Sequence, residues 1–419
     1  MIKMVEAFSG IGSQVKALKN LNVDVDVLAT VEWDVNAIYA YDIIHNGKQN
    51  LDKYNSISRQ RIINDLSVHT LSYDGKKPMN KKSLSKMNDD TLKRIHAAIE
   101  RTKNKISIAD LKDSDLPEMI DLLTYSFPCQ DLSMCGYWHG NKSGIDRDAN
   151  NRSGMLWEVE RILMERKTEE RKMPRYMLME NVSSISSKMH VHNFNEWKAF
   201  LEELGYHNEF YMLNSLDFGI PQNRPRAYML SVWCESEEKR KEISEYLFLN
   251  KPEKSVPRDI MEFLRLDYSN PVYRKEADLS QPNDTPSRRR IKDDNRIIYD
   301  GKKFLYERIT TITTKQDRNP NSGLILYNNE REGKSDFRYI TPRECFLFMG
   351  FDEEDYDKLI DNNFMMNTRH MFITDSKLIK MAGNSIVVNV LEAIFSQMIR
   401  LDRDIFGIDN SKDKSRRVG

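Results

Sequence analysis

Apolar positions in the first half of the chain fall into two alternating patterns. Short continuous runs of strand length stand at residues 2–7, 25–31, 119–127, 173–182 and 226–233. Between them, apolar residues recur every three or four positions, as in "GMLWEVERILMERK" (154–167) and in "FNEWKAFLEELGYH" (194–207), a helix that Gly205 should close. This alternation predicts an α/β fold with an open, mostly parallel sheet, which binds ligands at the carboxyl ends of its strands.

Two stretches interrupt the alternation and predict the domain organisation. Residues 46–105 are polar and rich in Lys and Asn, so we expect an insertion on the outside of the sheet of a catalytic domain at 1–235. Residues 236–335 combine prolines, many charges and little periodicity, which is typical of a separate, loop-rich domain. Residues 336–407 return to apolar helical spacing and should pack back on the first domain, and 408–419 form a tail.

Composition and charge limit the possible partners only weakly. The chain has 419 residues, 39% hydrophobic and 31% charged, which suits a protein with a sizeable core. Its formal net charge of zero argues mildly against nucleic acid, because phosphate contacts usually make such proteins basic. A neutral protein with one basic face stays compatible: "SRRRIK" (287–292) and "KDKSRR" (412–417) are local candidates, although each run alone is more typical of a solvated surface.

The cysteines and the apolar runs predict the compartment. Four cysteines stand far apart, at Cys129, Cys135, Cys234 and Cys345. They are too few for a disulfide framework and lack the paired spacing of a zinc site, so we expect no metal and reduced thiols in the cytoplasm. No apolar stretch approaches the length that crosses a bilayer and no basic leader precedes the first strand, so neither a membrane nor export is expected.

The turns after the first strands suggest a nucleotide-like ligand. "VEAFSGIGS" places Gly10 and Gly12 between a strand and a helix, where the backbone can approach a ligand closely. The pattern is GxG and not GxGxxG, so a pyrophosphate is not implied, and a plain turn is an alternative. Glu32 can bind ribose hydroxyls, Trp33 can stack on a purine, and Asp110 can accept from an adenine amino group. Each could be an ordinary loop residue, but together they favour an adenosyl ligand without polyphosphate, as in S-adenosylmethionine.

A cysteine follows the third predicted strand. Cys129 comes directly after Pro128 at the strand tip, next to the expected ligand edge. A thiol there suggests a nucleophile, although most cysteines are structural. Because a free thiol has a pKa of about 8.5, only a small fraction is thiolate at neutral pH, and the site has to assist it.

Acidic and basic side chains stand at the neighbouring strand ends. Glu180 and Asn181 end the fourth strand, where partial desolvation favours a neutral carboxyl group that can donate a proton. "PQNRPRAYML" supplies Gln222, Arg224 and Arg226, and two arginines at this spacing can hold an oxygen or a phosphate, although a surface salt bridge is the common alternative. Together the groups describe addition of a thiolate to C6 of cytosine, a hydrogen bond at N3 and methyl transfer to C5.

With these blocks in place, the chain resembles the cytosine-C5 DNA methyltransferases. The matching blocks are "EAFSGIG", "VEWD", "SFPCQDLS", "MENV", "QNRPR", "TPRECFLFMGF" and "AGNSIVVNVLEAIF", in the order of that family and across nearly the whole chain. The motif sequences are most similar to those of small bacterial enzymes of the restriction-modification and CpG-methylating kind. We do not infer a CpG target from this similarity, because the region that should determine the target has a different sequence.

The resemblance implies a fold, a cofactor and partners. The fold is a Rossmann-like sheet of S-adenosylmethionine-dependent methyltransferases with a smaller, loop-rich target recognition domain. The enzyme would act as a monomer on double-stranded DNA, in the cytoplasm of a bacterium or encoded by a phage, alongside a cognate restriction endonuclease. Departures from the family are the insertion at 46–105 and the individual recognition domain.

The resemblance also assigns residues. It implies catalytic roles for Cys129, Glu180, Arg224 and Arg226, with Asn181 positioning the loop, cofactor contacts for Phe8, Gly10, Gly12, Glu32, Trp33, Asp110, Asn384 and Ser385, and DNA contacts for Gln130, Ser133 and Thr311.

Three other functions share part of this pattern with a DNA methyltransferase. A tRNA cytosine-C5 methyltransferase shares the motifs, but its branch carries a "CFT" tripeptide and a compact recognition region, neither of which is found here. A non-catalytic DNA-binding relative would have lost the cysteine or the acid. A nicotinamide-dependent dehydrogenase would require GxGxxG.

Overall fold

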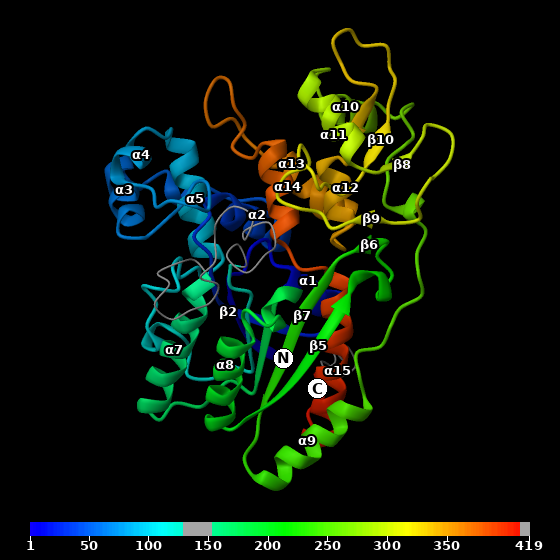
Figure 1. The fold of residues 1–419 in the computed structure, drawn as a ribbon. Coiled ribbons are helices and arrows are strands. Elements are labelled where there is room, and N and C mark those ends of the chain that lie inside the picture. The colour runs from blue at the N-terminus through cyan, green and yellow to red at the C-terminus, as the bar shows by residue number, and fades with distance from the viewer. Residues whose placement is uncertain (129–152, 411–419) are drawn as a thin grey trace, which may run out of the picture. The chain divides into compact units, whose positions relative to one another are not determined.

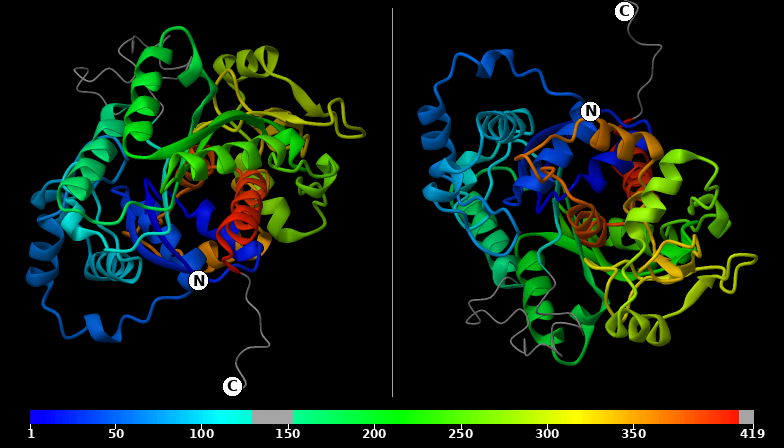
Figure 2. Two further views of the ribbon diagram at one scale, coloured as in Figure 1. Left: turned by 90° about the horizontal axis from the view of Figure 1, so that it is seen from below. Right: turned by 90° about the horizontal axis from the view of Figure 1, so that it is seen from above.

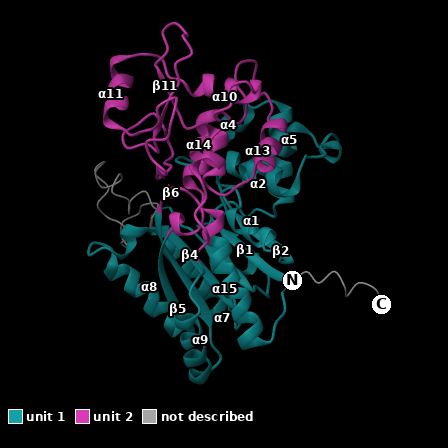
Figure 3. Cartoon of the chain, turned by 90° about the vertical axis from the view of Figure 1, so that its right-hand side faces the viewer, with its two compact units in different colours: residues 1–213, 225–253, 391–419 teal, residues 214–224, 254–390 magenta. Residues whose placement is uncertain are grey.

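The chain folds into two compact units. The computed structural model describes residues 1–128 and 153–410. Unit 1 comprises residues 1–213, 225–253 and 391–419, and unit 2 comprises residues 214–224 and 254–390 (Figures 1 and 3).

A six-stranded sheet forms the centre of unit 1. Its strands follow the order β2 (Val25–Val31), β1 (Ile2–Ala7), β3 (Leu122–Tyr125), β4 (Tyr176–Val182), β7 (Pro225–Trp233) and β5 (Tyr206–Asn214). β1 pairs in parallel with β2 and β3, and β3 with β4, whereas β4 and β7 are antiparallel. The carboxyl ends of the first four strands therefore meet at one edge, and β7 begins at that edge, with Arg226 opposite Val182. The predicted α/β fold is confirmed.

Helices cover both faces of this sheet. The helices of unit 1 next to the sheet are α1 (Ser13–Asn20), α2 (Val35–Asn46), α7 (Leu156–Thr168), α8 (Val191–Glu203), α9 (Glu237–Leu249) and α15 (Val388–Phe406), the last from Leu391 onward. α7 and α8 share an apolar core with Val5 and Met177 and the other residues of the same strand faces. Successive strand residues point to opposite faces, so Glu6 and Tyr176 meet the other layer. There Tyr41 of α2 donates to Glu6, and Tyr176 donates to Asp402 of α15.

The last helix packs on unit 1, as expected. Tyr211 of β5 bonds to Gln397 of α15, and Tyr246 of α9 donates to Asp404 at 2.7 Å. α9 and α15 accordingly lie side by side in Figure 1 and in the left view of Figure 2.

The stretch at 46–105 contains short helices. They are α3 (Arg59–Ser67), α4 (Lys81–Ser85) and α5 (Asp89–Arg101). α5 begins where the Asn88 side chain accepts a hydrogen bond from the main-chain N–H of Thr91, and it packs against α2. Its buried residues Leu92, Ile95 and Ala98 recur at helical spacing.

Unit 2 is built from short elements. They are β6 (Gln222–Asn223), α10 (Pro271–Ser280), α11 (Pro286–Asp294), β8 (Ile297–Tyr299), β9 (Ile309–Thr310), β10 (Leu324–Leu326), β11 (Phe337–Tyr339), α12 (Pro342–Leu347), α13 (Glu353–Asp361) and α14 (Asp375–Asn384). β11, β10 and β8 form one sheet, and β6 pairs in parallel with β9. A fully buried ion pair of 2.8 Å between Arg338 and Glu344 ties β11 to α12.

Single-turn 3₁₀ helices connect some of these elements. They lie at Asp52–Tyr54, Asp113–Asp115, Ser153–Met155, Ser183–Ser186, Ser215–Asp217 and Ile260–Glu262.

Two elements differ from the sequence pattern. β5 was not expected, because Tyr206–Asn214 mixes apolar and polar residues: it is an edge strand, and most of its side chains are only partly buried. After α8 the chain passes through Gly205, whose φ is 98°, directly into this strand. The final apolar stretch is not one helix either, since α14 ends at Asn384 and α15 starts at Val388.

The final stretch also corrects the expectation about membrane-length segments. Among the described residues, Asp375–Phe406 contains one window long and apolar enough to cross a bilayer by length and composition alone. Because 67% of that window is buried inside the protein, and the helix is interrupted within the stretch, core packing explains its apolar character.

The boundaries of the two compact units differ from the predicted domain boundaries. The return to unit 1 begins at Leu391, and residues 336–390 belong with 254–335 in unit 2. The functional division into catalytic and recognition domains stays a prediction.

Candidate functional site

Most predicted residues of unit 1 lie at the carboxyl edge of the sheet. The turn after β1 carries Phe8, Gly10 and Gly12, the turn after β2 carries Glu32 and Trp33, β4 ends with Glu180 and Asn181, and β7 starts with Arg226. In-register pairs join these strand ends: Ala7 lies opposite both Val31 and Tyr125, and Tyr125 lies opposite Met179.

The turn after β1 is tight and open on one side. Phe8 has a φ of 58°, in the left-handed region that few non-glycine residues adopt. Gly10 and Gly12 also have positive φ, 54° and 80°. A Cβ on Gly12 would overlap the rings of His45 and Tyr41, whereas a Cβ on Gly10 would meet no atom within 4 Å. Gly12 thus permits close packing of α1 on α2, and the backbone at Gly10 faces open space.

Main-chain donors fix the carboxylate of Glu32. The N–H of Gly10 donates to Oε2 at 3.2 Å, and the N–H groups of Trp33 and Asp34 donate to Oε1 at 2.9 and 2.8 Å. Glu32 therefore joins the first two turns of the edge. Its burial raises its pKa to about 7, with the nearby Asp34 carboxylate adding to the effect.

Asp110 lies on the surface before β3. Its side chain is exposed, and the hydroxyl of Thr70 donates to its Oδ2 at 2.7 Å. Trp33 is half-buried.

Asn181 connects the ends of β3 and β4. Its Nδ2 donates to the main-chain carbonyl of Phe127 at 3.1 Å, and its Oδ1 accepts from the N–H of Val182 at 2.8 Å. The side chain is only 1% exposed. Phe127 precedes Pro128 and Cys129 in the sequence, so the bond fixes the backbone from which the predicted nucleophile extends.

Glu180 and Arg226 form a pair across β4 and β7. Glu180 lies opposite Tyr228 in the register, which places Arg226 diagonally across on the same face. Nε of Arg226 is 3.4 Å from Oε1 of Glu180, and the side chains are 15% and 12% exposed. A carboxyl group and a guanidinium group are therefore held together at the carboxyl edge of the sheet.

Arg224 belongs to a second cluster, inside unit 2. Its guanidinium donates to the carbonyls of Ile312, Gly383 and Ser385 at 2.8 to 2.9 Å, and the side chain is 4% exposed. Gln222 is fully buried, accepts from the N–H of Ile312 and donates to the carbonyl of Phe348. Residues two apart in a strand share a face, which would place Arg224 and Arg226 on the same side. The structure instead bonds Arg224 to main-chain carbonyls of unit 2 and Arg226 to Glu180 of unit 1.

Thr311, Asn384 and Ser385 flank the same cluster. The hydroxyl of Thr311 donates to the carbonyl of Asn223 at 2.7 Å. A Cβ on Gly383 would lie 2.5 Å from the carbonyl group of Thr313, so "AGNS" requires glycine at this close approach. Asn384 is exposed and Ser385 is buried, with its hydroxyl donating to the carbonyl of Met381.

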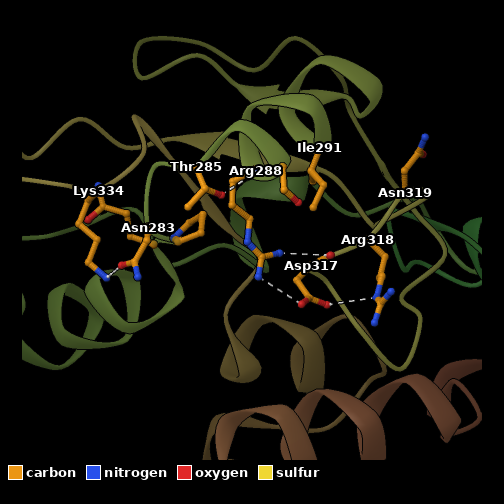
Figure 4. Close-up of a pocket in the computed structure, with 11 residues that line it drawn as sticks. Asn283, Thr285, Arg288, Ile291, Asp317, Arg318, Asn319 and Lys334 are labelled. Carbon is orange, nitrogen blue, oxygen red and sulfur yellow. Dashed lines mark hydrogen bonds and ion pairs between the residues drawn. The ribbon is translucent and has the colours of Figure 1, made fainter.

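A cavity of about 710 Å³ opens elsewhere in unit 2 (Figure 4). It is lined by Gln281, Pro282, Asn283, Thr285, Ser287, Arg288, Ile291, Asp317, Arg318, Asn319 and Lys334. Asp317 contacts Arg288 at 3.4 Å and Arg318 at 3.8 Å. In the basic run at 287–292, Arg289 and Lys292 also pair with carboxylates, those of Asp284 and Asp336. Acidic neighbours thus offset much of this run's charge.

Three predicted residues lie outside the described part of the chain: Cys129, Gln130 and Ser133. Of the cysteines that the structure describes, Cys234 and Cys345 are buried free thiols, and burial raises the pKa of both. Within residues 1–128 and 153–410, no group of three or more His, Cys, Asp and Glu side chains could hold a metal ion.

Comparison with known proteins identifies the family. The model of the C-5 cytosine-specific DNA methylases matches residues 75–400. The chain belongs to this family. The orphan methyltransferase M.SssI of Spiroplasma monobiae is 32% identical over 409 residues, which cover 95% of this chain and 97% of that protein. The type II methyltransferase M2.ScrFI of Lactococcus lactis subsp. cremoris is 30% identical, over 96% of this chain and 99% of that protein.

Solved structures agree on the fold. The crystal structure of the S. pombe Dnmt2 methyltransferase is similar with a TM-score of 0.57 and 17% identity, over 95% of this chain and 98% of that one. The Entamoeba histolytica methyltransferase EhMeth gives a TM-score of 0.52 with 16% identity, over 96% and 98%. At this identity the likeness shows the fold alone. The predicted family, fold and activity of a DNA cytosine-5 methyltransferase are confirmed.

The first two turns of this DNA methylase fit the adenosyl part of a methyl donor. The backbone at Gly10 leaves open space, and the carboxylate of Glu32 is fixed beside it by three N–H groups. A partly exposed indole follows at Trp33. An acid for hydroxyl groups, an aromatic face and a small residue are a donor set that suits a nucleoside.

Several residues that support the site were not among the sequence-based predictions. Asn104 bonds to both main-chain groups of Glu32, and Ser72 bonds to the carbonyl of Trp33. Both stand in a Lys- and Asn-rich stretch where polar residues give no distinguishing signal. Glu6 did carry a signal, since an acid alone in an apolar strand requires a partner, here the hydroxyl of Tyr41.

Proposed function

We propose that the chain is a sequence-specific methyltransferase of double-stranded DNA that uses S-adenosylmethionine and turns its target cytosine out of the duplex. The observation that carries the proposal is the contact of Glu180 with Arg226 beside the bond from Asn181 to Phe127. These groups would surround a cytosine ring presented to the thiol of Cys129.

The chemistry assigns one role to each group. The thiolate of Cys129 forms a bond to C6 of the ring while Glu180 gives a proton or a hydrogen bond to N3. Arg226 holds O2 and keeps the carboxyl group of Glu180 in position. The electron density that reaches C5 would then form the bond to the methyl group while the bond between that group and the sulfonium sulfur of S-adenosylmethionine breaks, which leaves S-adenosylhomocysteine. Loss of the C5 proton to water, with the N3 proton returned to Glu180, would restore the double bond and expel the sulfur of Cys129.

S-adenosylmethionine supplies the methyl group when it is bound. The residues proposed to hold it in unit 1 are Phe8, Gly10, Gly12, Glu32, Trp33 and Asp110, and those in unit 2 are Asn384 and Ser385. Arg224 is proposed to act indirectly: its three carbonyl bonds keep the segments around Ile312 and Ser385 in place.

The enzyme has to unstack the base before it reacts. Turning a base out of a duplex costs a few kcal/mol, which contacts to the surrounding DNA offset. We propose DNA contacts for Gln130, Ser133 and Thr311 and target recognition by residues 236–335. A relative named as a type II methyltransferase supports a place in a restriction-modification system, whereas relatives named as orphan methyltransferases do not call for a partner endonuclease. We propose further that the enzyme acts as a monomer in the cytoplasm of a bacterium or a phage-infected cell.

Bisulfite sequencing tests the proposal. The chain is expressed in a host without cytosine methylation, and its plasmid is sequenced after bisulfite treatment, with Cys129→Ser as the matched control. The expected result is protected cytosines within one short, recurring context, absent from the control. A parallel incubation of the pure enzyme with labelled cofactor and either DNA or tRNA separates the alternatives: label in tRNA alone would overturn the proposal.

A further inference from the structure

The insertion at 46–105 contacts three of the residues proposed to bind adenosine. Its contacts are main-chain and side-chain hydrogen bonds to Glu32, Trp33 and Asp110, all within unit 1. α4 and α5 lie between Ser72 and Asn104 in the sequence, and α3 precedes Thr70.

The middle of the insertion runs alongside the turn after β2. The N–H of Ser72 donates to the carbonyl of Trp33 at 2.7 Å, and the carbonyl of Ser72 accepts from the N–H of Val35 at 2.9 Å. Next to it, the side chain of Asn36 donates to the carbonyl of Tyr73 at 2.8 Å. The backbone of Trp33 is therefore held by the insertion on the side away from β1.

This part of the insertion is itself rigidly built. Ser72 is fully buried, and its hydroxyl donates to the carbonyl of Lys77 at 2.7 Å while it accepts from the N–H of Gly75 at 3.0 Å. The carboxylate of Asp74 accepts from the N–H groups of Lys76 and Lys77. A short loop closed in this way can position its neighbours.

The end of the insertion holds the backbone of Glu32. Asn104 accepts from the N–H of Glu32 at 3.1 Å and donates to its carbonyl at 3.0 Å, and its Oδ1 also accepts from the N–H of Ile106. The N–H of Lys105 donates to the carbonyl of Thr30 at 2.8 Å. The insertion thus continues the hydrogen bonding of β2 beyond its paired residues.

Thr70 orients Asp110. Its hydroxyl donates to Oδ2 at 2.7 Å, and among the described residues it is the side chain that donates to this carboxylate. Because Asp110 is exposed, without this bond its carboxylate would rotate freely in solvent. With the carboxylate oriented by this bond, its remaining lone pairs can accept from an exocyclic amino group.

We propose that the insertion is part of the cofactor site and that Thr70 is a positioning residue for recognition of the adenine amino group through Asp110. The inference rests on the proposed use of S-adenosylmethionine. The insertion then contributes to cofactor selection, with Ser72 and Asn104 fixing Trp33 and Glu32 from behind.

The test measures binding of S-adenosylhomocysteine to the full chain by calorimetry, without any catalytic step. Thr70→Val keeps the shape of the side chain and removes the hydroxyl, and Thr70→Ser retains it. Thr168→Val is the matched control, since Thr168 donates to a carbonyl of α7 from an exposed position. We expect Thr70→Val to weaken binding about tenfold, and Thr70→Ser and Thr168→Val to bind as the wild type does.

A second ligand separates positioning from general damage. In an analogue that carries purine in place of adenine, the amino group is absent. If Thr70 acts through Asp110, wild type and Thr70→Val bind this analogue equally well, so the tenfold difference disappears. The same loss with both ligands, or no loss with either, would overturn the inference. Failure of the wild type to bind S-adenosylhomocysteine at all would instead overturn the proposed use of the cofactor.

Discussion

The amide of Asn181 donates to the main-chain carbonyl of Phe127 across 3.1 Å, joining the end of β4 to the end of β3. The bond is buried, and Cys129, the proposed nucleophile, stands two residues after Phe127 in the sequence. The backbone at Phe127 is therefore held by a side chain of the neighbouring strand.

Replacing Asn181 should slow the chemical step. Asn181→Asp places a carboxylate against the Phe127 carbonyl, so the end of β3 has to move, and we expect the rate of a single turnover to fall about a hundredfold. The affinity for S-adenosylhomocysteine should stay within about twofold of the wild type's, because the turns after β1 and β2 are unchanged. Asn208→Ala is the control, since Asn208 also donates to a main-chain carbonyl, that of Lys198. A turnover rate equal to the wild type's would show that the bond does not position the nucleophile.

Glu180→Gln should remove the acid while retaining the shape of the site. The amide still fits beside Arg226, but it cannot give a proton to N3, so we expect a rate loss of about a hundredfold to ten-thousandfold. Affinity for DNA, measured by fluorescence anisotropy, should change little. A loss of DNA affinity with an unchanged rate of transfer would contradict the assigned role.

Arg224 should matter for stability more than for chemistry. Its replacement by Met leaves two buried carbonyls and one half-buried carbonyl without this donor, and each buried group left unsatisfied costs about 1–3 kcal/mol. We therefore expect a clear fall in the melting temperature of Arg224→Met, and weaker binding of S-adenosylhomocysteine to the folded fraction, because the bonds of Arg224 hold the segment around Ser385. Arg226→Met should show the reverse: little change in melting temperature and loss of transfer. Equal melting temperatures for the two variants would contradict a structural role for Arg224 and a chemical role for Arg226.

Stability should depend on the proton of Glu6. Burial raises the pKa of Glu6 to about 7, above its ordinary value of 4.5, so the folded protein holds this proton more tightly than the unfolded chain does. The resulting stabilisation is fully present below pH 4.5 (roughly) and is lost as the pH rises through about 7.

Chemical denaturation at several pH values checks this sign. Each pKa unit corresponds to about 1.4 kcal/mol, so between about pH 4.5 and pH 8 the wild type should lose about 3 kcal/mol of unfolding free energy relative to Glu6→Gln. Comparison with the variant cancels the other groups. A constant difference between the two proteins across this range would mean that Glu6 is not protonated in the fold.

The fold was largely readable because its signals are local. Strands β1 to β4 and β7 are continuous apolar runs, and α7 and α8 have helical spacing with clear ends. β5 was hidden, because an edge strand with Asn208 and Glu209 among its residues need not be apolar throughout. The break at Ser385–Val387 was hidden for the opposite reason, since the stretch is apolar on both sides of it.

The site was readable only where a residue type is unusual for its position. A glycine pair, a proline before a cysteine, and an acid at a strand end are such signals. Distant parts of the sequence supply the hydrogen-bond partners of Asn104, Ser72 and Thr70. A polar residue within a polar stretch gives no indication of such a partner. The different partners of Arg224 and Arg226 depend on tertiary contacts that two-residue spacing does not encode.

The central claim is the bond between the sulfur of Cys129 and C6 of a cytosine. It is tested most directly with a duplex in which 5-fluorocytosine replaces cytosine, because the fluorine at C5 cannot leave as a proton does and the enzyme stays attached after methyl transfer. With S-adenosylmethionine added, the account predicts a complex stable to denaturant whose crosslinked peptide contains Cys129, and none with Cys129→Ser. A crosslink that maps to Cys135, Cys234 or Cys345, or no crosslink on a duplex whose unmodified form is methylated, would contradict it.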